Sequence, residues 1–195
     1  MVLSDTVFLS PVRRVRRLAT ASVLTLAMLG TGGTLNTASA AGCTGSQARP
    51  TPASRSAVNR TTVCLINAER RRRGLRPVRL NAKLSAAARL HSRDMVDRQY
   101  FSHTEPDGST LVNRVRAAGY LDGASRWKVG EILAWGSGAY ASPRAIVRAW
   151  MRSPGHREQL LTPDYRDIGI GLNARAPLVV PAAGATYTVD FGVTR

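Results

Sequence analysis

The stretch YFSHTEPDG at residues 100–108 decides the fold, together with GEIL at residues 130–133 and WMRSPGHREQLL at residues 150–161. These stretches supply His103, Glu131 and His156, each beside a turn-forming Gly or Pro. Imidazole nitrogens and a carboxylate oxygen suit Zn²⁺, and three protein ligands leave one position for water or substrate. The spacings match no compact metal motif. From spacing alone, each residue can instead have a local structural role.

The first forty residues predict a signal peptide, residues 1–40. Arginines at positions 13, 14, 16 and 17 form a basic region, and the apolar run at residues 18–29 (LATASVLTLAML) is shorter than the ~20 residues of a membrane helix. The small residues Ala38, Ser39 and Ala40 then resemble a cleavage site. We therefore expect export, cleavage after Ala40 and a mature chain without a transmembrane segment.

Both cysteines, Cys43 and Cys64, follow the expected cut. An even number of cysteines in an exported chain favours a disulfide, because the compartment is oxidising. The AAG sequence before Cys43 is also a weak form of a lipid-anchor signal, and a lipid on Cys43 would leave Cys64 as an odd thiol. The two interpretations exclude each other, and we expect the disulfide.

The chain is strongly basic, with a formal net charge of +16. This charge attracts polyanions, so an anionic envelope polymer or lipid is a plausible partner. An arginine-rich composition also follows from genomic base bias, so basicity by itself does not name a partner. The chain has no recognised nucleic-acid motif, and export removes most nucleic acid from reach, so we expect no specific nucleic acid.

Residues 41–56 are small, polar and proline-containing, which predicts a flexible linker. A single domain is expected at residues 57–195. It opens with a helix over residues 57–73, where apolar residues recur at helical spacing, and Gly74 suits the left-handed position that ends a helix.

A second helix is expected over residues 81–98, with Asn81 as its cap. His91 falls on the apolar face of this helix, which favours a packed role for its side chain. After an aperiodic loop, Ser109 can cap a short helix over residues 110–118.

The last part of the chain contains a short apolar run at residues 129–134. It then predicts two helices, one over residues 142–151 and one from residue 153 onward, and two strands over residues 168–172 and 186–193. His156 is placed in the first turn of the second of these helices. Trp150 lies on an amphipathic helix and is expected in the core. Helices come early and strands late, so the pattern indicates an α+β fold.

These stretches resemble the CAP superfamily, in its secreted bacterial branch of SCP-like or YkwD-like proteins. HSRDM at residues 91–95, IGIG at residues 168–171 and YTVDFG at residues 187–192 also resemble that branch. The resemblance covers about residues 63–192. It implies a CAP-type α-β-α sandwich with helices packed on a small antiparallel sheet.

The family commonly gathers two His and two acidic residues in one cleft. His103 matches the first His, Glu131 the glutamate of the GEN segment and His156 the second His, so these three are the candidate ligands of Zn²⁺ or another divalent cation. The chain departs from the pattern at three positions: Ser153 for the second glutamate, Ile132 for Asn and Val189 for a polar residue. The implied site is one acid short.

The resemblance and the export signal predict a secreted protein, extracellular or at the cell envelope, that binds a ligand or partner through a His/Glu cleft, with metal dependence as a further expectation. The alternative is a metal-assisted hydrolase of peptides or esters in which His103 and His156 hold the ion and Glu131 is the general base. Serine hydrolysis is not favoured, because no serine has the strand-to-helix context of G-x-S-x-G.

Overall fold

The computed structural model describes residues 2–8, 42–180 and 183–195. Its elements follow in the order β1 (Val2–Phe8), α1 (Arg55–Arg71), β2 (Arg79–Leu80), α2 (Ala82–Asp97), α3 (Leu111–Ala117), β3 (Trp127–Ser137), the 3-10 helix η2 (Gly138–Ala141), α4 (Pro143–Arg152), α5 (Pro154–Leu161), β4 (Asp167–Asn173) and β5 (Gly184–Thr194). The strands form one sheet in the order β1-β3-β5-β4-β2. The two longest strands, β3 and β5, are therefore neighbours near its centre.

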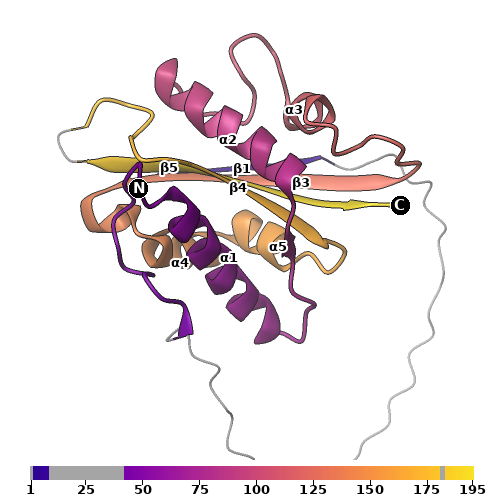
Figure 1. The fold of residues 1–195 in the computed structure, drawn as a ribbon, viewed down its shortest axis with the longest axis horizontal. Helices are drawn as coiled ribbons and strands as arrows, with labels where there is room; N and C mark the ends of the chain where they lie inside the picture. The colour runs from indigo at the N-terminus through magenta and orange to yellow at the C-terminus, as the bar shows by residue number, and fades with distance from the viewer. Residues whose placement is uncertain (1, 9–41, 181–182) are drawn as a thin grey trace, which may run out of the picture.

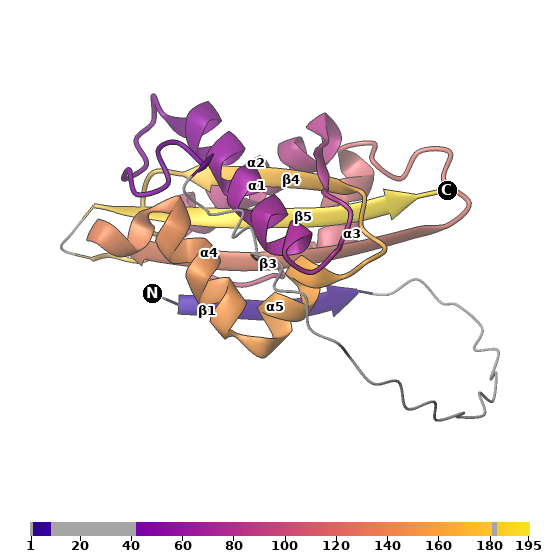
Figure 2. The same ribbon diagram turned by 90° about the horizontal axis from the view of Figure 1, so that it is seen from below.

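The sheet lies between two layers of helices. Figure 1 shows α2 and α3 on one face and α1, α4 and α5 on the other, and Figure 2 shows the second layer from below. Each face has its own cluster of buried apolar side chains. The α-β-α sandwich implied by the resemblance is thus confirmed. The sheet is mixed rather than wholly antiparallel, because the short strand β2 pairs with β4 in parallel while the other strand pairs are antiparallel.

Helix α2 packs very closely on β4 because two glycines have no side chain there. A Cβ at Gly169 would lie 2.2 Å from the backbone carbon of Leu84, and one at Gly171 would lie 2.0 Å from the carbonyl oxygen of Ala88. Ser92, one turn further along α2, donates a hydrogen bond to the carbonyl of Gly171 at 3.1 Å. The IGIG stretch therefore sets the distance between the helix and the sheet.

Two helix caps were predicted, one correctly. Asn81 caps α2, since its Oδ1 accepts from the backbone N–H groups of Lys83 and Leu84. The expected cap of α3 was wrong: Thr110, not Ser109, is the capping residue, and Asn113 completes a capping box with it. A capping box satisfies two free backbone donors at once, which explains why the helix begins one residue later.

Strand β3 is longer than the apolar run at residues 129–134. It pairs with β5 through all eleven of its positions, from Trp127 opposite Thr194 to Ser137 opposite Gly184. Behind it, Trp150 is fully buried and donates its indole N–H to the carbonyl of Leu133 at 3.1 Å. The core position expected for Trp150 is confirmed.

The segment that follows the expected cut is fastened to the domain. Cys43 and Cys64 form a disulfide with their Cα atoms 5.8 Å apart, as predicted. Thr61 donates a hydrogen bond to the carbonyl of Thr44, and the backbone N–H of Arg144 donates to the carbonyl of Ser46, both at 2.8 Å. In this state the Cys43 sulfur is not available for a lipid.

Strand β1 lies within the expected signal peptide, and the rest of that peptide, with the expected cut, falls outside the described residues. Cleavage therefore stays a prediction, as do the domain limits. Within residues 2–8, 42–180 and 183–195, no helix is long and apolar enough to cross a bilayer.

Candidate functional site

The structure brings His103 and Glu131 together on the α2/α3 face of the sheet. His103 comes from the loop between α2 and α3, and its Nδ1 lies 2.7 Å from Oε1 of Glu131 on β3. Arg114 of α3 donates from Nη2 to the other oxygen, Oε2, also at 2.7 Å. Both oxygens of the Glu131 carboxylate are therefore engaged.

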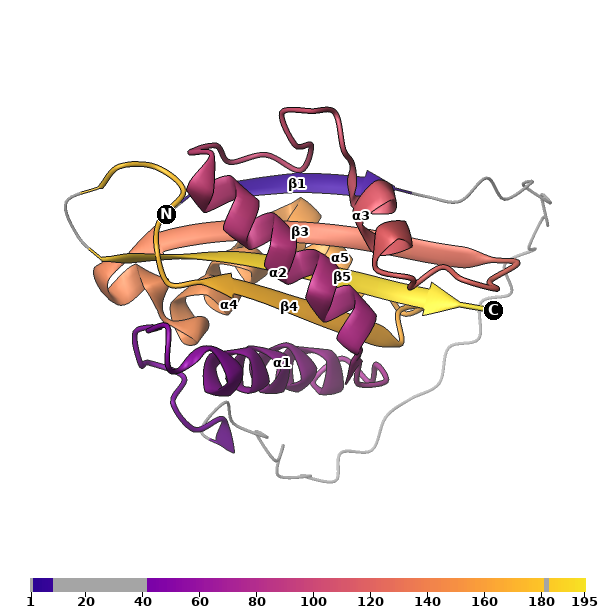
Figure 3. The ribbon, with the colours of Figure 1, turned by 45° about the horizontal axis from the view of Figure 1, so that its top comes forward.

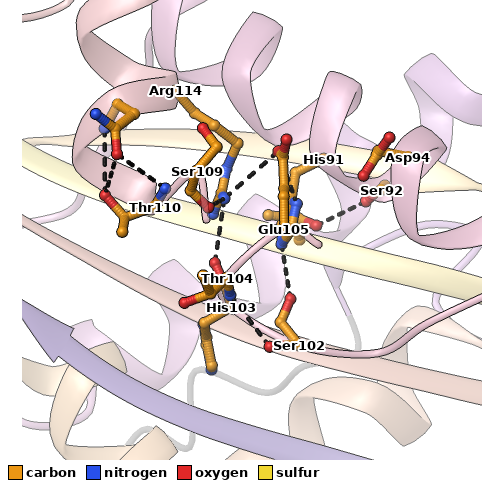
Figure 4. Close-up of polar contacts among 12 residues, drawn as sticks. His91, Ser92, Asp94, Ser102, His103, Thr104, Glu105, Ser109, Thr110 and Arg114 are labelled. Atoms are coloured by element: carbon orange, nitrogen blue, oxygen red, sulfur yellow. Dashed lines mark hydrogen bonds and ion pairs between the residues drawn. The ribbon is translucent and has the colours of Figure 1, made fainter. Parts of the chain in front are cut away.

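Arg114 also fixes the loop that carries His103. Its Nη1 donates to the carbonyl of His103 at 3.1 Å and lies 3.6 Å from Oε1 of Glu105 (Figure 4). His103 is 5% exposed, Arg114 7% and Glu131 1%. The side chains of both sequence-predicted residues, His103 and Glu131, are thus buried.

Glu131 is ionised despite its burial. Burial alone raises a carboxyl pKa, but the hydrogen bond from His103 and the positive charge of Arg114 outweigh it and lower the pKa of Glu131 to about 2. The site therefore contains a fixed negative charge that is neutralised by a guanidinium, in a place closed to water.

Asp190, which no sequence motif marked as a site residue, lies directly opposite Glu131 in the β3–β5 register. Its side chain is fully buried. Burial, followed by the charge of Glu131, raises the pKa of Asp190 well above its usual value. Neither carboxyl oxygen of Asp190 makes a hydrogen bond to the described residues. Asp190 and Glu131 could hydrogen-bond to each other only if one of the two carboxyl groups held a proton. The raised pKa of Asp190 favours the protonated form of its carboxyl group.

His91 has the packed position that its helical face predicted, and it also supports the loop. Its Nε2 lies 3.0 Å from the carbonyl of Ser102, and its Nδ1 lies 3.4 Å from Oε1 of Glu105 (Figure 4). The side chain is fully buried. Burial is the main reason that the pKa of His91 falls to about 4, so the imidazole is neutral at pH 7.

His156 comes from a different layer. It lies in the first turn of α5, and Figure 1 shows α5 on the side of the sheet opposite α2 and α3. Its Nδ1 is 2.7 Å from Oγ of Ser153, the residue that replaces the second family glutamate. His156 is buried, as His103 is.

The described residues do not fit a metal ion as they stand. Among them, no group of three or more His, Cys, Asp or Glu side chains is arranged to hold one. Glu131 already accepts a hydrogen bond from Arg114, whose positive charge neutralises the carboxylate. Metal binding by the set of His103, Glu131 and His156 stays a prediction of the family resemblance, and the contacts of Glu131 argue against it.

The comparisons with known proteins agree with the fold. A family model described as "Cysteine-rich secretory protein family", CAP, matches residues 63–178. The chain belongs to the CAP family. Among curated proteins it is 37% identical over 139 residues to "Uncharacterized protein YkwD" of Bacillus subtilis, covering 70% of this chain and 51% of that protein. It is also 32% identical over 111 residues to the B. subtilis "Uncharacterized membrane protein YlbC", covering 57% and 30%.

Two solved structures resemble the chain as well. One is an extracellular protein containing a SCP domain from Bacillus anthracis, with 26% identity, a TM-score of 0.53 and coverage of 73% of this chain and 43% of that one. Another, an outer surface protein from Borrelia burgdorferi, has 22% identity and a TM-score of 0.54, covering 68% and 90%, and shows the shared fold. The chain spans about half the length, or less, of the curated relatives it matches.

Proposed function

We propose that this CAP protein is exported and acts by binding, at or outside the cell envelope. The observation that supports binding over catalysis is the state of Glu131, whose two carboxylate oxygens are held by His103 and Arg114. Export is supported by the predicted signal peptide and by the extracellular relative from B. anthracis.

A hydrolase that used Glu131 as its base would need a different environment. A general base works best when its pKa is near the working pH and it can reach the proton that it removes. The pKa of Glu131 is lowered to about 2, and the side chain is 1% exposed. These properties suit a residue that holds the loop carrying His103 in a fixed position.

The partner proposed here is an anionic polymer of the envelope, and the arginines of α4 are its candidate contacts. A groove of about 440 Å³ lies between α1 and α4, with Leu65, Val147 and Met151 among its apolar residues. Its basic residues are Arg72, Arg144, Arg148 and Arg152, and its one acidic residue is Glu69. Arg148 and Arg152 are exposed and one helical turn apart, so they can contact successive charges of a polymer.

Sedimentation with an insoluble polyanionic wall polymer, and with anionic vesicles, tests this proposal. We expect binding at low salt that weakens as salt screens the charges, and we expect Arg148→Glu with Arg152→Glu to weaken it at least tenfold. The matched control is Arg116→Glu with Arg126→Glu, which changes two exposed arginines outside the groove by the same charge. Equal losses in both double variants would leave only nonspecific attraction, and absence of binding at low salt would refute the proposal.

A further inference from the structure

The outer edge of β3 is occupied by the chain's own N-terminal strand. β1 pairs with β3 antiparallel through seven positions, from Val2 opposite Trp135 to Phe8 opposite Val129. β1 is the outermost strand of the sheet on that side, as Figure 3 shows. The edge of β3 is therefore shaped to accept an extended segment along residues 129–135.

The segment that fills this edge belongs to the predicted signal peptide. After cleavage at Ala40, β3 would lose its neighbour and present a row of unpaired backbone N–H and C=O groups. Proteins manage such edges by covering them or by pairing them with another strand, and strand addition is a common mode of peptide recognition. The pairing of residues 2–8 thus shows that the vacated edge can bind an extended polypeptide segment.

The same edge borders the candidate site. Glu131 is paired with Thr6 in the β1–β3 register, so an added strand runs beside the buried carboxylate. Helix α5 contacts both β1 and β3 and forms a wall on the other face. Figure 4 shows the His103 imidazole extending from its loop toward the side of the sheet where β1 lies.

His103 has one ring nitrogen available to a bound strand. Its Nδ1 is used by Glu131, while Nε2 is buried and has no hydrogen-bond partner among the described residues. A buried polar nitrogen without a partner costs free energy, which a ligand's N–H or O–H group can recover. This nitrogen is a second observation, independent of the edge, that indicates a ligand.

We propose that in the cleaved protein the outer edge of β3 binds an extended polypeptide segment of a partner, antiparallel and about seven residues long, with His103 Nε2 as a side-chain contact. A polypeptide fits because the edge offers a regular ladder of main-chain donors and acceptors, which a carbohydrate or phosphate polymer cannot match in register. This inference rests on the export part of the proposed function, and it concerns a different surface from the α1/α4 groove.

The test compares the secreted, processed protein with a full chain in which Ala40→Arg blocks cleavage. The probe is a synthetic peptide with the sequence MVLSDTVF, and the control peptide carries proline at its third and fifth positions, because proline removes main-chain donors. We expect the processed protein to bind the probe with micromolar affinity, the uncleaved chain and the proline peptide to show at least tenfold weaker binding, and His103→Ala to weaken binding several-fold. Bound probe should slow hydrogen exchange of residues 129–135.

Several results would overturn the inference. They are N-terminal sequencing that finds residues 2–8 retained in the secreted protein, a processed protein that does not fold, equal binding of both peptides, or unchanged exchange along β3. A processed protein that forms a dimer through β3 and excludes the probe would also overturn it, in favour of a second copy as the occupant. N-terminal sequencing tests export, and sedimentation tests the polymer, so failure of either is distinguishable from failure of peptide binding.

Discussion

Glu131 and Asp190 lie directly opposite each other on the two central strands, both are buried, and the pKa values of their carboxyl groups are shifted in opposite directions. The pKa of Asp190 is raised, so this residue costs stability as pH rises from its ordinary pKa through its raised one. Asp190→Asn removes that cost. We expect the variant to be at least as stable as wild type at pH 7. The difference between its thermal midpoint and that of wild type should increase from pH 4 to pH 8.

The control for this prediction is Asp122→Asn, an exposed acid outside the site. Its midpoint should follow wild type at every pH. A loss of stability for Asp190→Asn that grows with pH would contradict the raised pKa of Asp190.

Two residues of the site should give acid sensitivity in separate pH ranges. The pKa of His91 is lowered to about 4, so its contribution is complete above its ordinary value near 6.5 and is lost as pH falls from there to about 4. The pKa of Glu131 is lowered to about 2, so its contribution is lost between about 4.5 and 2. His91→Gln should remove the loss of stability that wild type shows as pH falls from about 6.5 to 4, which amounts to about 3 kcal/mol in the free energy of unfolding.

Urea unfolding from pH 7.5 to 3 measures these effects. Glu131→Gln should lower stability at pH 7 and flatten the lower range only. If each variant keeps the wild-type slope in its own range, the pKa directions assigned to these two residues are wrong.

Much of the fold was predictable because it depends on local sequence patterns, namely helical spacing and capping residues. Apolar residues at helical spacing predicted α1 and α2 to within a few residues, and Asn81 capped α2 as expected. The limits of β3 were less accessible, because its length depends on pairing with β5, which is distant in sequence. The cap of α3 was misplaced by one residue because Ser109 and Thr110 are both good caps.

Only some residues of the candidate site could be predicted from the sequence. His103 and Glu131 were found through their resemblance to family motifs, and the structure joins them. Arg114 and Asp190 were missed, since an arginine in a basic chain has no distinguishing signal and the position of Asp190 becomes meaningful only when β3 and β5 are in register. His156 lies in the first turn of a helix, as predicted, and its place in one site with His103 and Glu131 stays a prediction.

Zinc titration tests the family-derived metal set. Because Arg114 and His103 already engage Glu131, we expect calorimetry near pH 7 to show no saturable Zn²⁺ binding by the wild-type protein. Arg114→Met, which frees one carboxylate oxygen, is the variant with which binding can appear. Wild-type binding that both His103→Ala and His156→Ala abolish would restore the metal site and reopen metal-assisted hydrolysis.

The close approach of α2 to β4 gives a prediction about stability. Gly171→Ala places a methyl group against the backbone of Ala88, and we expect a loss of at least about 2–3 kcal/mol in the free energy of unfolding, as for overpacked cores. Gly42→Ala, at a glycine with open space around it, should change stability by about 0.5 kcal/mol or less. Equal effects in the two variants would contradict the packing described here.

The central claim is that Arg114 and His103 hold an ionised Glu131 as the rigid support of the site. A double-mutant cycle of Arg114→Met and Glu131→Gln, measured by urea unfolding at pH 7 beside the exposed control Arg116→Met, tests it most directly. We expect each single variant to lose about 3–5 kcal/mol, because each leaves a buried partner unpaired. The double variant should recover about 2 kcal/mol or more of the summed loss. A coupling energy below about 0.5 kcal/mol would show that the two side chains act independently and would contradict the account.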